Sequence, residues 1–136
     1  MNRPAGPSWS GVGLVALGGT VGTGSRYLLS GLLPHPSGVP VGTLAVNVVG
    51  AFLLALLLER LADHRVDAGW SRRIRLGVGT GVLGGFTTYS ALAADTVLVW
   101  SHHPGLALAY ALGTVVVGGL ASVAGIGVGR SVRRRS

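Results

Sequence analysis

The chain has 136 residues, of which 49% are hydrophobic and only 11% are charged, and its mean hydropathy is +0.59. This composition excludes an ordinary water-soluble domain and indicates a single membrane domain covering residues 1–136. The net charge of +7 results from eleven arginines, no lysine and four acidic residues. Most of these arginines flank apolar runs, which is typical of a membrane topology signal, so no nucleic-acid partner is expected. The chain has no cysteine, which excludes disulfides and thiolate metal sites.

Four apolar runs follow one another along the chain, each close to the roughly 20 residues that a helix needs to cross a bilayer. They predict transmembrane helices at about 11–33, 41–58, 76–100 and 105–128, with a basic tail at 129–136. Leucine and valine do not alternate strictly with polar residues in these runs, so helices are favoured over the strands of a membrane barrel. The predicted fold class is therefore an all-α membrane protein with four transmembrane helices.

The arginines lie very unequally on the two sides of the membrane that this arrangement creates. The side formed by the two tails and the loop between the second and third runs carries ten of them: Arg3, Arg60, Arg65, Arg72, Arg73, Arg75, Arg130, Arg133, Arg134 and Arg135. The opposite side, formed by residues 34–40 and 101–104, carries none. The positive-inside rule therefore places both termini in the cytoplasm, for a multi-pass protein of the cell (inner or plasma) membrane.

The third run contains the unusual stretch GVGTGVLGGFTTYSALAAD, at residues 77–95. It holds five glycines, and a run of hydroxyl side chains follows the pair Gly84-Gly85. Unwound backbone survives inside a membrane only beside protein, an ion or a water-filled cavity, because nothing else satisfies its freed polar groups. The stretch therefore predicts a helix that is broken at the paired glycines and whose freed carbonyls have a partner. The alternative is that the glycines only let helices pack closely.

A few polar side chains inside the predicted spans could carry chemistry. Arg26 either extends to the lipid headgroups or lines a water-filled vestibule. Asn47 either holds helices together or donates hydrogen bonds to an anion. Thr114 lies one helical turn after Tyr110, so the two hydroxyls share a face, although each alone is more often a packing residue. Asp95 is interpreted as a solvated residue at the end of its span.

Two further patterns are interpreted as accidental. Gly79, Gly81 and Gly84 spell a dinucleotide-binding fingerprint, but that motif needs a preceding strand and a βαβ unit. The histidines of the loops have no thiolate or carboxylate partner that would indicate a metal site. Because the chain shows no catalytic triad, paired carboxylates or phosphate loop, we expect no enzyme.

Four segments together resemble the CrcB/Fluc family of fluoride channels: GGTVGTGSRY (18–27), GTLAVNVVGAFLLALL (42–57), GVLGGFTTYSAL (81–92) and YALGTVVVGG (110–119). A Gly-Gly-x-Thr-Thr motif followed by an aromatic residue and serine, after a Val-Asn-x-x-Gly span, is not a generic membrane pattern. The resemblance implies a channel that lowers cytoplasmic fluoride by passive efflux. It also implies an antiparallel dimer of two four-helix subunits with two narrow anion pores, and a central sodium ion (Na⁺) that is structural and not transported.

The resemblance further implies roles for individual residues. The backbone carbonyls of Gly84 and Thr87 would hold the sodium ion, and Arg26 would lie near the vestibule. The pore-lining residues would be Asn47, Tyr89, Ser90, Leu92, Tyr110 and Thr114, with Thr88 continuing the hydroxyl-rich side. The family has phenylalanine at the positions of Tyr89 and Leu92, where electropositive ring edges face the ion. Tyr89 keeps a ring, whereas Leu92 has none.

The unequal arginines lead to a further hypothesis, because a dimer with subunits in both orientations needs nearly balanced loops. We hypothesise that this subunit inserts in one direction and pairs with an oppositely oriented paralogue. A heterodimer could keep one good pore, which would account for Leu92. Two alternatives remain: a non-conducting partner or scaffold subunit, and a small four-helix proton-coupled exporter. The exporter is disfavoured because the first span has Arg26 and no acidic residue.

Overall fold

In the computed structural model, residues 8–33, 39–62 and 68–133 are described, and every element within them is a helix. In chain order the elements are α1 (Trp9–Leu32), α2 (Val41–Arg60), α3 (Ala68–Ile74), η2 (Arg75–Leu83), α4 (Gly84–Phe86), α5 (Tyr89–Trp100) and α6 (Pro104–Arg133). The nine-residue element η2 is a π-helix. The elements α3, η2, α4 and α5 follow one another along the third apolar run, so the described residues form four rods.

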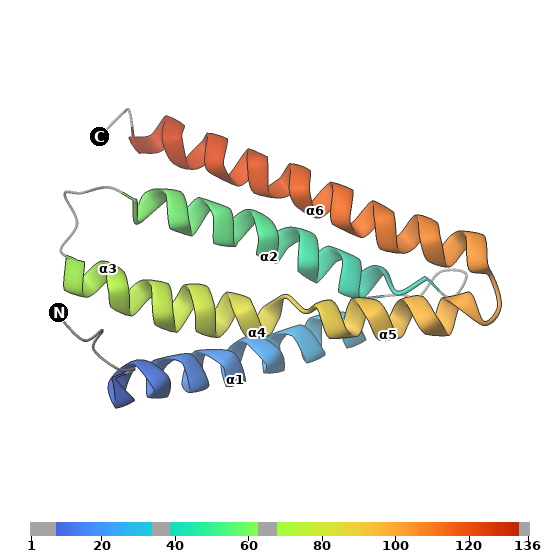
Figure 1. Ribbon diagram of the computed structural model, residues 1–136, viewed down its shortest axis with the longest axis horizontal. Helices are drawn as coiled ribbons and strands as arrows, with labels where there is room; N and C mark the ends of the chain where they lie inside the picture. Colours follow the sequence, from blue (N-terminus) through green and yellow to red (C-terminus); the bar gives the residue numbers. More distant parts are fainter. Residues whose placement is uncertain (1–7, 34–38, 63–67, 134–136) are drawn as a thin grey trace, which may run out of the picture.

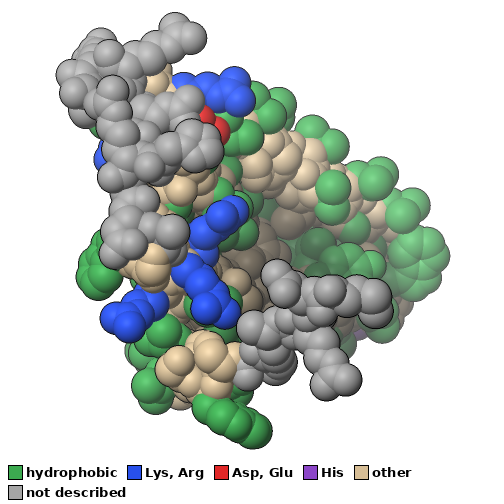
Figure 2. All heavy atoms as spheres, turned by 60° about the vertical axis from the view of Figure 1, so that its left-hand side comes forward, with side chains coloured by type: hydrophobic (Ala, Val, Ile, Leu, Met, Phe, Trp, Pro, Cys, Tyr) green, Lys and Arg blue, Asp and Glu red, His purple; other side chains and the backbone are tan. Residues whose placement is uncertain are grey.

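The four rods lie side by side, with α2 between α6 and the composite rod, and α1 on the other side of that rod (Figure 1). α6 packs along α2 and α5, whereas α1 packs along η2 and α4. The beginning of α1 and the end of α6 lie at the same end of the molecule (Figure 1). This end carries the arginines at the end of α2, along α3 and η2 and at the end of α6, and Figure 2 shows them gathered there.

Three of the rods are long and apolar enough to cross a membrane: Val41–Arg60, Gly69–Trp100 and Pro104–Val132. They indicate a multi-pass membrane protein. The first rod, α1, has 24 residues but is not among the three, because its glycine- and threonine-rich middle lowers its hydropathy. The fourth crossing therefore stays a prediction. The composite rod begins at Ala68, well before the expected start at 76, because α3 extends it toward the arginine-rich end.

Glycines allow α1 to approach η2 and α4 at backbone distance. A Cβ atom on Gly18 would collide with the Gly77 carbonyl oxygen, and one on Gly22 would collide with the Val82 carbonyl oxygen. A Cβ on Gly85 would lie 2.5 Å from the carbonyl oxygen of Gly19, again on α1. Small residues are the usual means of close helix packing in membranes, where lipid is as apolar as leucine. The packing interpretation of these glycines is therefore confirmed.

The composite rod is nevertheless broken within the Gly-Gly-x-Thr-Thr motif. Thr87 (φ −83°, ψ 141°) and Thr88 (φ −150°, ψ 126°) are extended, and helix resumes at Tyr89. The expected break is confirmed, but its expected location at the paired glycines is wrong. Gly84 and Gly85 stay helical in α4, and Gly85 packs directly against Gly19 of α1. The π-helical geometry before the break was not expected.

The interior is thin, and much of the surface is apolar. The buried hydrophobic side chains include Val46, Leu83, Leu92 and Tyr110, but no large side chain among the described residues is completely buried. Large exposed hydrophobic residues lie on α1, α2, α5 and α6, and Figure 2 shows how much of one face they cover. Such a surface suits a chain that faces lipid or a second subunit.

Candidate functional site

The break is held by the side chain of Asn47 on α2. The Thr88 backbone N–H donates to Asn47 Oδ1 at 2.9 Å, and Asn47 Nδ2 donates to the Thr88 carbonyl oxygen at 3.3 Å. Asn47 thus satisfies both backbone groups of an extended residue, as a neighbouring strand would. An amide nitrogen carries two hydrogens, and the structure describes an acceptor for only one of them. One N–H of Asn47 therefore stays available beside the break.

The spacing of the Val-Asn-x-x-Gly pattern has a structural reason. Gly50 lies one turn after Asn47 on α2, and a Cβ at Gly50 would collide with Thr87 Cγ2 and lie 3.2 Å from Phe86 Cδ1. Asparagine and glycine therefore present one face of α2 to the break, with the amide binding Thr88 and the glycine making room for Thr87. The Phe86 ring thus lies against Gly50 of α2.

The carbonyl groups before the break are only partly satisfied. Leu83 O accepts from both the backbone N–H of Thr87 at 2.9 Å and Thr87 Oγ1 at 2.8 Å. Gly85 O accepts from Thr23 Oγ1 on α1 at 3.4 Å. In a continuous helix Gly84 O would accept from the N–H of Thr88, but that N–H donates to Asn47. The Gly84 carbonyl therefore lacks its helical donor.

A groove of about 470 Å³ opens beside the break, between α2, α5 and α6, and we call it the central groove. Four of the six predicted pore-lining residues line it together: Asn47, Tyr89, Leu92 and Thr114. Its polar wall also contains Thr87, Thr88 and Ser122, and its remaining lining is apolar. The groove thus brings residues of three helices to the break, as the predicted pore requires. Ser90 and Tyr110 are not part of its lining.

The hydroxyls near the groove differ in what they can still donate. Thr114 Oγ1 donates to the Tyr110 carbonyl oxygen at 2.7 Å within its own helix, so it faces the groove as an acceptor. Thr88 Oγ1 and Ser90 Oγ lie 2.8 Å apart. Only one of these two hydroxyl hydrogens is used in that contact, so the pair keeps one O–H for a ligand.

Tyr89 and Leu92, which the resemblance matches to phenylalanine positions, lie in different surroundings. Leu92 is 7% exposed and lines the wall of the groove, whereas Tyr89 is 81% exposed. A side chain as exposed as Tyr89 faces lipid or another subunit. Tyr89 therefore lies at the open side of the groove.

A second hollow of about 430 Å³ lies between α1, α2 and α5, and we call it the Asp95 hollow. Arg26, Ser30, Thr43 and Asp95 form its polar lining. Within the described ranges, Arg26 Nε, Ser30 Oγ and Asp95 Oδ2 are buried without a hydrogen-bond partner. Arg26 therefore lines a hollow, as the vestibule interpretation requires. The interpretation of Asp95 as a simply solvated residue is wrong, because the hollow buries one of its carboxylate oxygens.

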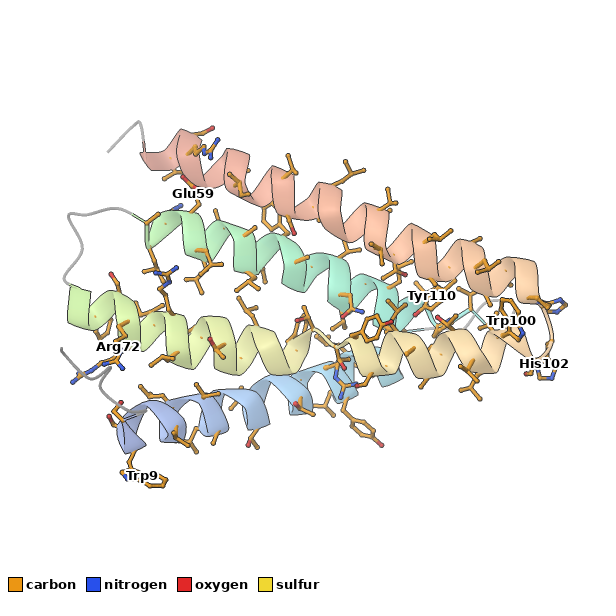
Figure 3. The ribbon with its side chains drawn as sticks, viewed as in Figure 1. Trp9, Glu59, Arg72, Trp100, His102 and Tyr110 are labelled. Atoms are coloured by element: carbon orange, nitrogen blue, oxygen red, sulfur yellow. The ribbon has the colours of Figure 1, made fainter. Side chains whose placement is uncertain are left out.

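Tyr110 lines neither cavity but contacts residues of both. Tyr110 is only 5% exposed. Its hydroxyl donates a hydrogen bond of 3.5 Å to the carbonyl oxygen of Pro40, which directly precedes α2. The same hydroxyl lies close enough to Asp95 and Thr43 to interact with both. Figure 3 shows Tyr110 on α6 among the neighbouring rods. Thr114 lines the central groove one turn later and donates to the Tyr110 carbonyl oxygen, so a polar line runs from the central groove through Thr114 and Tyr110 to Asp95.

Some polar residues of the two cavities and of the break were missed from the sequence. Thr43 lies one turn before Asn47 and Ser122 lies two turns after Thr114, so helical spacing alone places each on the face of a predicted site residue. Thr23, which donates to Gly85 O, had no such signal. Its role depends on how closely α1 approaches α4, and that approach is a property of the fold.

The sequence-family comparison covers this whole arrangement. The family described as "CrcB-like protein, Camphor Resistance (CrcB)" matches residues 13–126, which include α2, the break, α5 and most of α6. The chain belongs to the CrcB family. The residues that line the central groove and the Asp95 hollow, from Arg26 to Ser122, all lie inside the region that matches the CrcB family.

Several CrcB relatives are similar over most of their length. The chain is 47% identical over 120 residues to "Fluoride-specific ion channel FluC 2" of Leifsonia xyli subsp. xyli, covering 88% of this chain and 83% of the relative. It is 50% identical over 111 residues to "Fluoride-specific ion channel FluC 1" of Cutibacterium acnes, covering 80% and 78%. It is 44% identical over 125 residues to "Fluoride-specific ion channel FluC" of Agrobacterium fabrum, covering 89% and 97%.

Proposed function

We propose that this CrcB-family chain is a subunit of a fluoride-selective channel that lets fluoride leave the cytoplasm passively. The observation that carries the proposal is the central groove, in which Asn47 holds the broken helix open beside Tyr89, Leu92 and Thr114. The names of the relatives, which cover most of the chain, support fluoride as the ion.

The chemistry of the groove suits a small and strongly hydrated anion. Such an ion loses its water only where fixed donors replace it. The free N–H of Asn47 and the remaining O–H of the Thr88–Ser90 pair are two such donors, and the ring edge of Tyr89 is a weaker third. Conduction needs several moderate sites and not one tight site, and this spread of single donors fits that requirement.

The Asp95 hollow would be the next site that fluoride occupies after the central groove. Arg26 would raise the local concentration of anions there, and the polar line through Tyr110 would lead from the groove to it. No energy source is needed, because a negative membrane potential drives anions outward.

We further propose that a structural sodium ion is bound at the break by the backbone carbonyls of Gly84 and Thr87. The Gly84 carbonyl lacks its helical donor, and unwound carbonyls at half-helix ends are how membrane proteins coordinate Na⁺. No group of three or more His, Cys, Asp or Glu that could hold a metal occurs within the described ranges, which is consistent with a monovalent ion held by neutral oxygens. Two carbonyls are too few for a complete site, so a second subunit would supply the others.

The second subunit would stand antiparallel to this one, and we propose that it is an oppositely oriented paralogue. All the described arginines except Arg26 lie at the end of the molecule where α1 begins and α6 ends, so the positive-inside rule favours a single insertion with both termini in the cytoplasm. The open side of the central groove and the exposed ring of Tyr89 would then face the partner.

A second candidate function is a non-conducting partner or scaffold subunit. Leu92 favours it, because this buried side chain lines the groove without offering a ring edge. A proton-coupled exporter is disfavoured, because α1 carries no carboxylate among its residues.

A cellular test separates these functions. Bacteria that lack fluoride export should grow in millimolar fluoride when they express this chain together with an oppositely oriented family member. A scaffold subunit would give no better growth than the partner alone. Protection that required a proton gradient would favour the exporter.

A further inference from the structure

The arginine-rich end of the molecule holds a groove with two chemically different parts, between the beginning of α1 and the α3–η2 segment. The first part, of about 490 Å³, has Ser8, Ser10, Arg72 and Arg73 as its polar lining, and we call it the serine–arginine hollow. The second, of about 410 Å³, is walled by Val12, Val15 and Ala16, and we call it the apolar hollow. Both parts share Ser8, Gly11, Arg72 and Leu76, so they form one continuous groove.

The serine–arginine hollow carries positive charge that the described residues do not neutralise. Arg72 and Arg73 are both exposed, and no acidic residue of the described ranges lines either part of the groove. The first turn of α1 has no acidic residue either. Arg130, by contrast, pairs with Glu59 at 3.5 Å on the far side of the same end. The hollow is thus built to receive an anion.

Two tryptophans indicate the depth of the groove in the membrane. Trp9 follows Ser8 directly and is 89% exposed, and Trp70 lies two residues before Arg72 and is 59% exposed. Exposed indoles settle at the level of the lipid headgroups, and Figure 3 shows Trp9 and Arg72 at the same end of the molecule. Val15 lies six residues further along α1, which is about 9 Å deeper at the helical rise. The serine–arginine hollow is therefore at headgroup depth, and the apolar hollow reaches the acyl chains.

We propose that this groove binds one anionic glycerophospholipid of the surrounding bilayer. Its phosphate lies between Arg72 and Arg73, because guanidinium groups bind phosphate with paired hydrogen bonds, and the hydroxyls of Ser8 and Ser10 lie within the same hollow. One acyl chain follows Val12 and Ala16 along α1. Basic pockets between membrane helices on the cytoplasmic side are a known way of binding anionic headgroups. The bound lipid connects α1, the least hydrophobic rod, to α3.

The test is lipid binding by the purified full-length protein, measured by native mass spectrometry with phosphatidylglycerol and with phosphatidylcholine. The unmodified protein should retain phosphatidylglycerol preferentially. Replacing both arginines (Arg72→Gln/Arg73→Gln) should weaken that binding about tenfold or more. The matched control Arg60→Gln/Arg75→Gln removes the same charge from exposed positions at the same end, outside both hollows, and should stay within twofold. Equal losses in the two double variants would overturn the proposal in favour of diffuse charge.

A second arm distinguishes a lipid from a free phosphate. Ala16→Phe fills the apolar hollow without changing the charge, so it should weaken phosphatidylglycerol binding severalfold, whereas millimolar inorganic phosphate should not displace the lipid. Unchanged binding in Ala16→Phe together with displacement by phosphate would overturn the proposal. Should the double variant fail to fold, the single variants Arg72→Gln and Arg73→Gln against Arg75→Gln make the same comparison, and equal losses there would again overturn it.

Discussion

Asn47 and Thr88, 41 residues apart in the chain, are joined by two hydrogen bonds that give an extended residue inside a membrane helix a partner for both its N–H and its C=O. The pair ties α2 to the point where the third rod breaks. A single side chain therefore maintains the break and keeps one N–H beside the central groove. A single substitution of Asn47 therefore affects both the stability of the break and the proposed fluoride conduction. Comparing several substitutions at this position separates the two effects.

Replacing Asn47 with leucine should destabilise the protein and abolish fluoride flux. The change leaves the N–H and C=O of Thr88 without partners, and each buried orphan group costs about 1–3 kcal/mol. We expect a loss of about 3 kcal/mol in detergent unfolding experiments, together with no efflux above background. Asn47→Asp keeps an acceptor for the Thr88 N–H, so it should be more stable than Asn47→Leu. Because it adds a negative charge beside the groove, it should also show no fluoride flux.

Ser122→Ala is the control for these variants. Ser122 lines the same groove, but the shorter hydrogen bond of its hydroxyl is to Gly118 O of its own helix at 3.1 Å, and Ala51 O of α2 lies at 3.5 Å. Its removal should change stability by no more than about 0.5 kcal/mol and leave flux intact. If Asn47→Leu were as stable as Ser122→Ala, the break would not depend on Asn47.

Gly22→Ala should loosen α1 from the composite rod. The added methyl group would collide with the Val82 carbonyl oxygen, and such overpacking costs about 1–3 kcal/mol. Gly24→Ala on the same helix meets nothing within 4 Å, and alanine favours helix over glycine by about 0.8–1.0 kcal/mol. Thermal unfolding should therefore move in opposite directions for the two variants. A fall of similar size in both would contradict the packing of α1 described above.

Leu92→Phe should increase fluoride flux. The substitution restores a ring in the wall of the central groove, where the neighbouring space can accommodate the larger side chain, and ring edges are electropositive. Leu98→Phe, at an exposed position of the same helix, should leave the flux unchanged. The measurement is efflux at equal protein density. No gain from Leu92→Phe would show that its position does not limit conduction.

A single insertion direction can be tested with cysteine labelling, because the chain has no cysteine of its own. Ser101→Cys lies between α5 and α6, and Ser131→Cys lies near the end of α6; both sites are exposed. In intact cells a membrane-impermeant maleimide should label Ser101→Cys fully and Ser131→Cys not at all. Half-labelling of both variants would mean insertion in two directions and would contradict the hypothesis of an oppositely oriented paralogue.

A structural sodium ion predicts a stability that depends on the cation. The assembled channel should melt at a lower temperature when N-methylglucamine replaces Na⁺ at constant ionic strength, because ligands that bind only the folded state stabilise it. Identical melting temperatures in both buffers would argue against a sodium ion held by Gly84 and Thr87.

Part of this arrangement could be predicted from the sequence because it depends on local composition. The apolar runs set the helices, and the hydroxyls after Gly84-Gly85 indicated a break, because an uninterrupted membrane helix has little need of such a cluster. The residue at which the break occurs could not be predicted. It depends on α1, whose close approach requires Gly85 to stay helical, and on Asn47, which meets Thr88.

The surroundings of individual side chains were also beyond the sequence. Asp95 appeared to be a solvated end residue, but the packing of α1 against α2 and α5 creates the hollow that buries one of its oxygens. Thr114 matched a polar position of the family, yet its hydroxyl is bonded to Tyr110 O. Spacing along one helix predicts a shared face, but the partner of each polar atom depends on the neighbouring helices.

Fluoride efflux from liposomes tests the central claim most directly. Vesicles loaded with potassium fluoride and containing this chain with an oppositely oriented relative should release fluoride rapidly once valinomycin dissipates the counter-potential, while vesicles loaded with chloride should not release chloride. The release should disappear when Asn47→Leu is introduced into this chain alone. Three results would contradict a fluoride pathway through the central groove. They are no fluoride efflux, equal efflux of chloride and fluoride, and fluoride efflux that Asn47→Leu does not change.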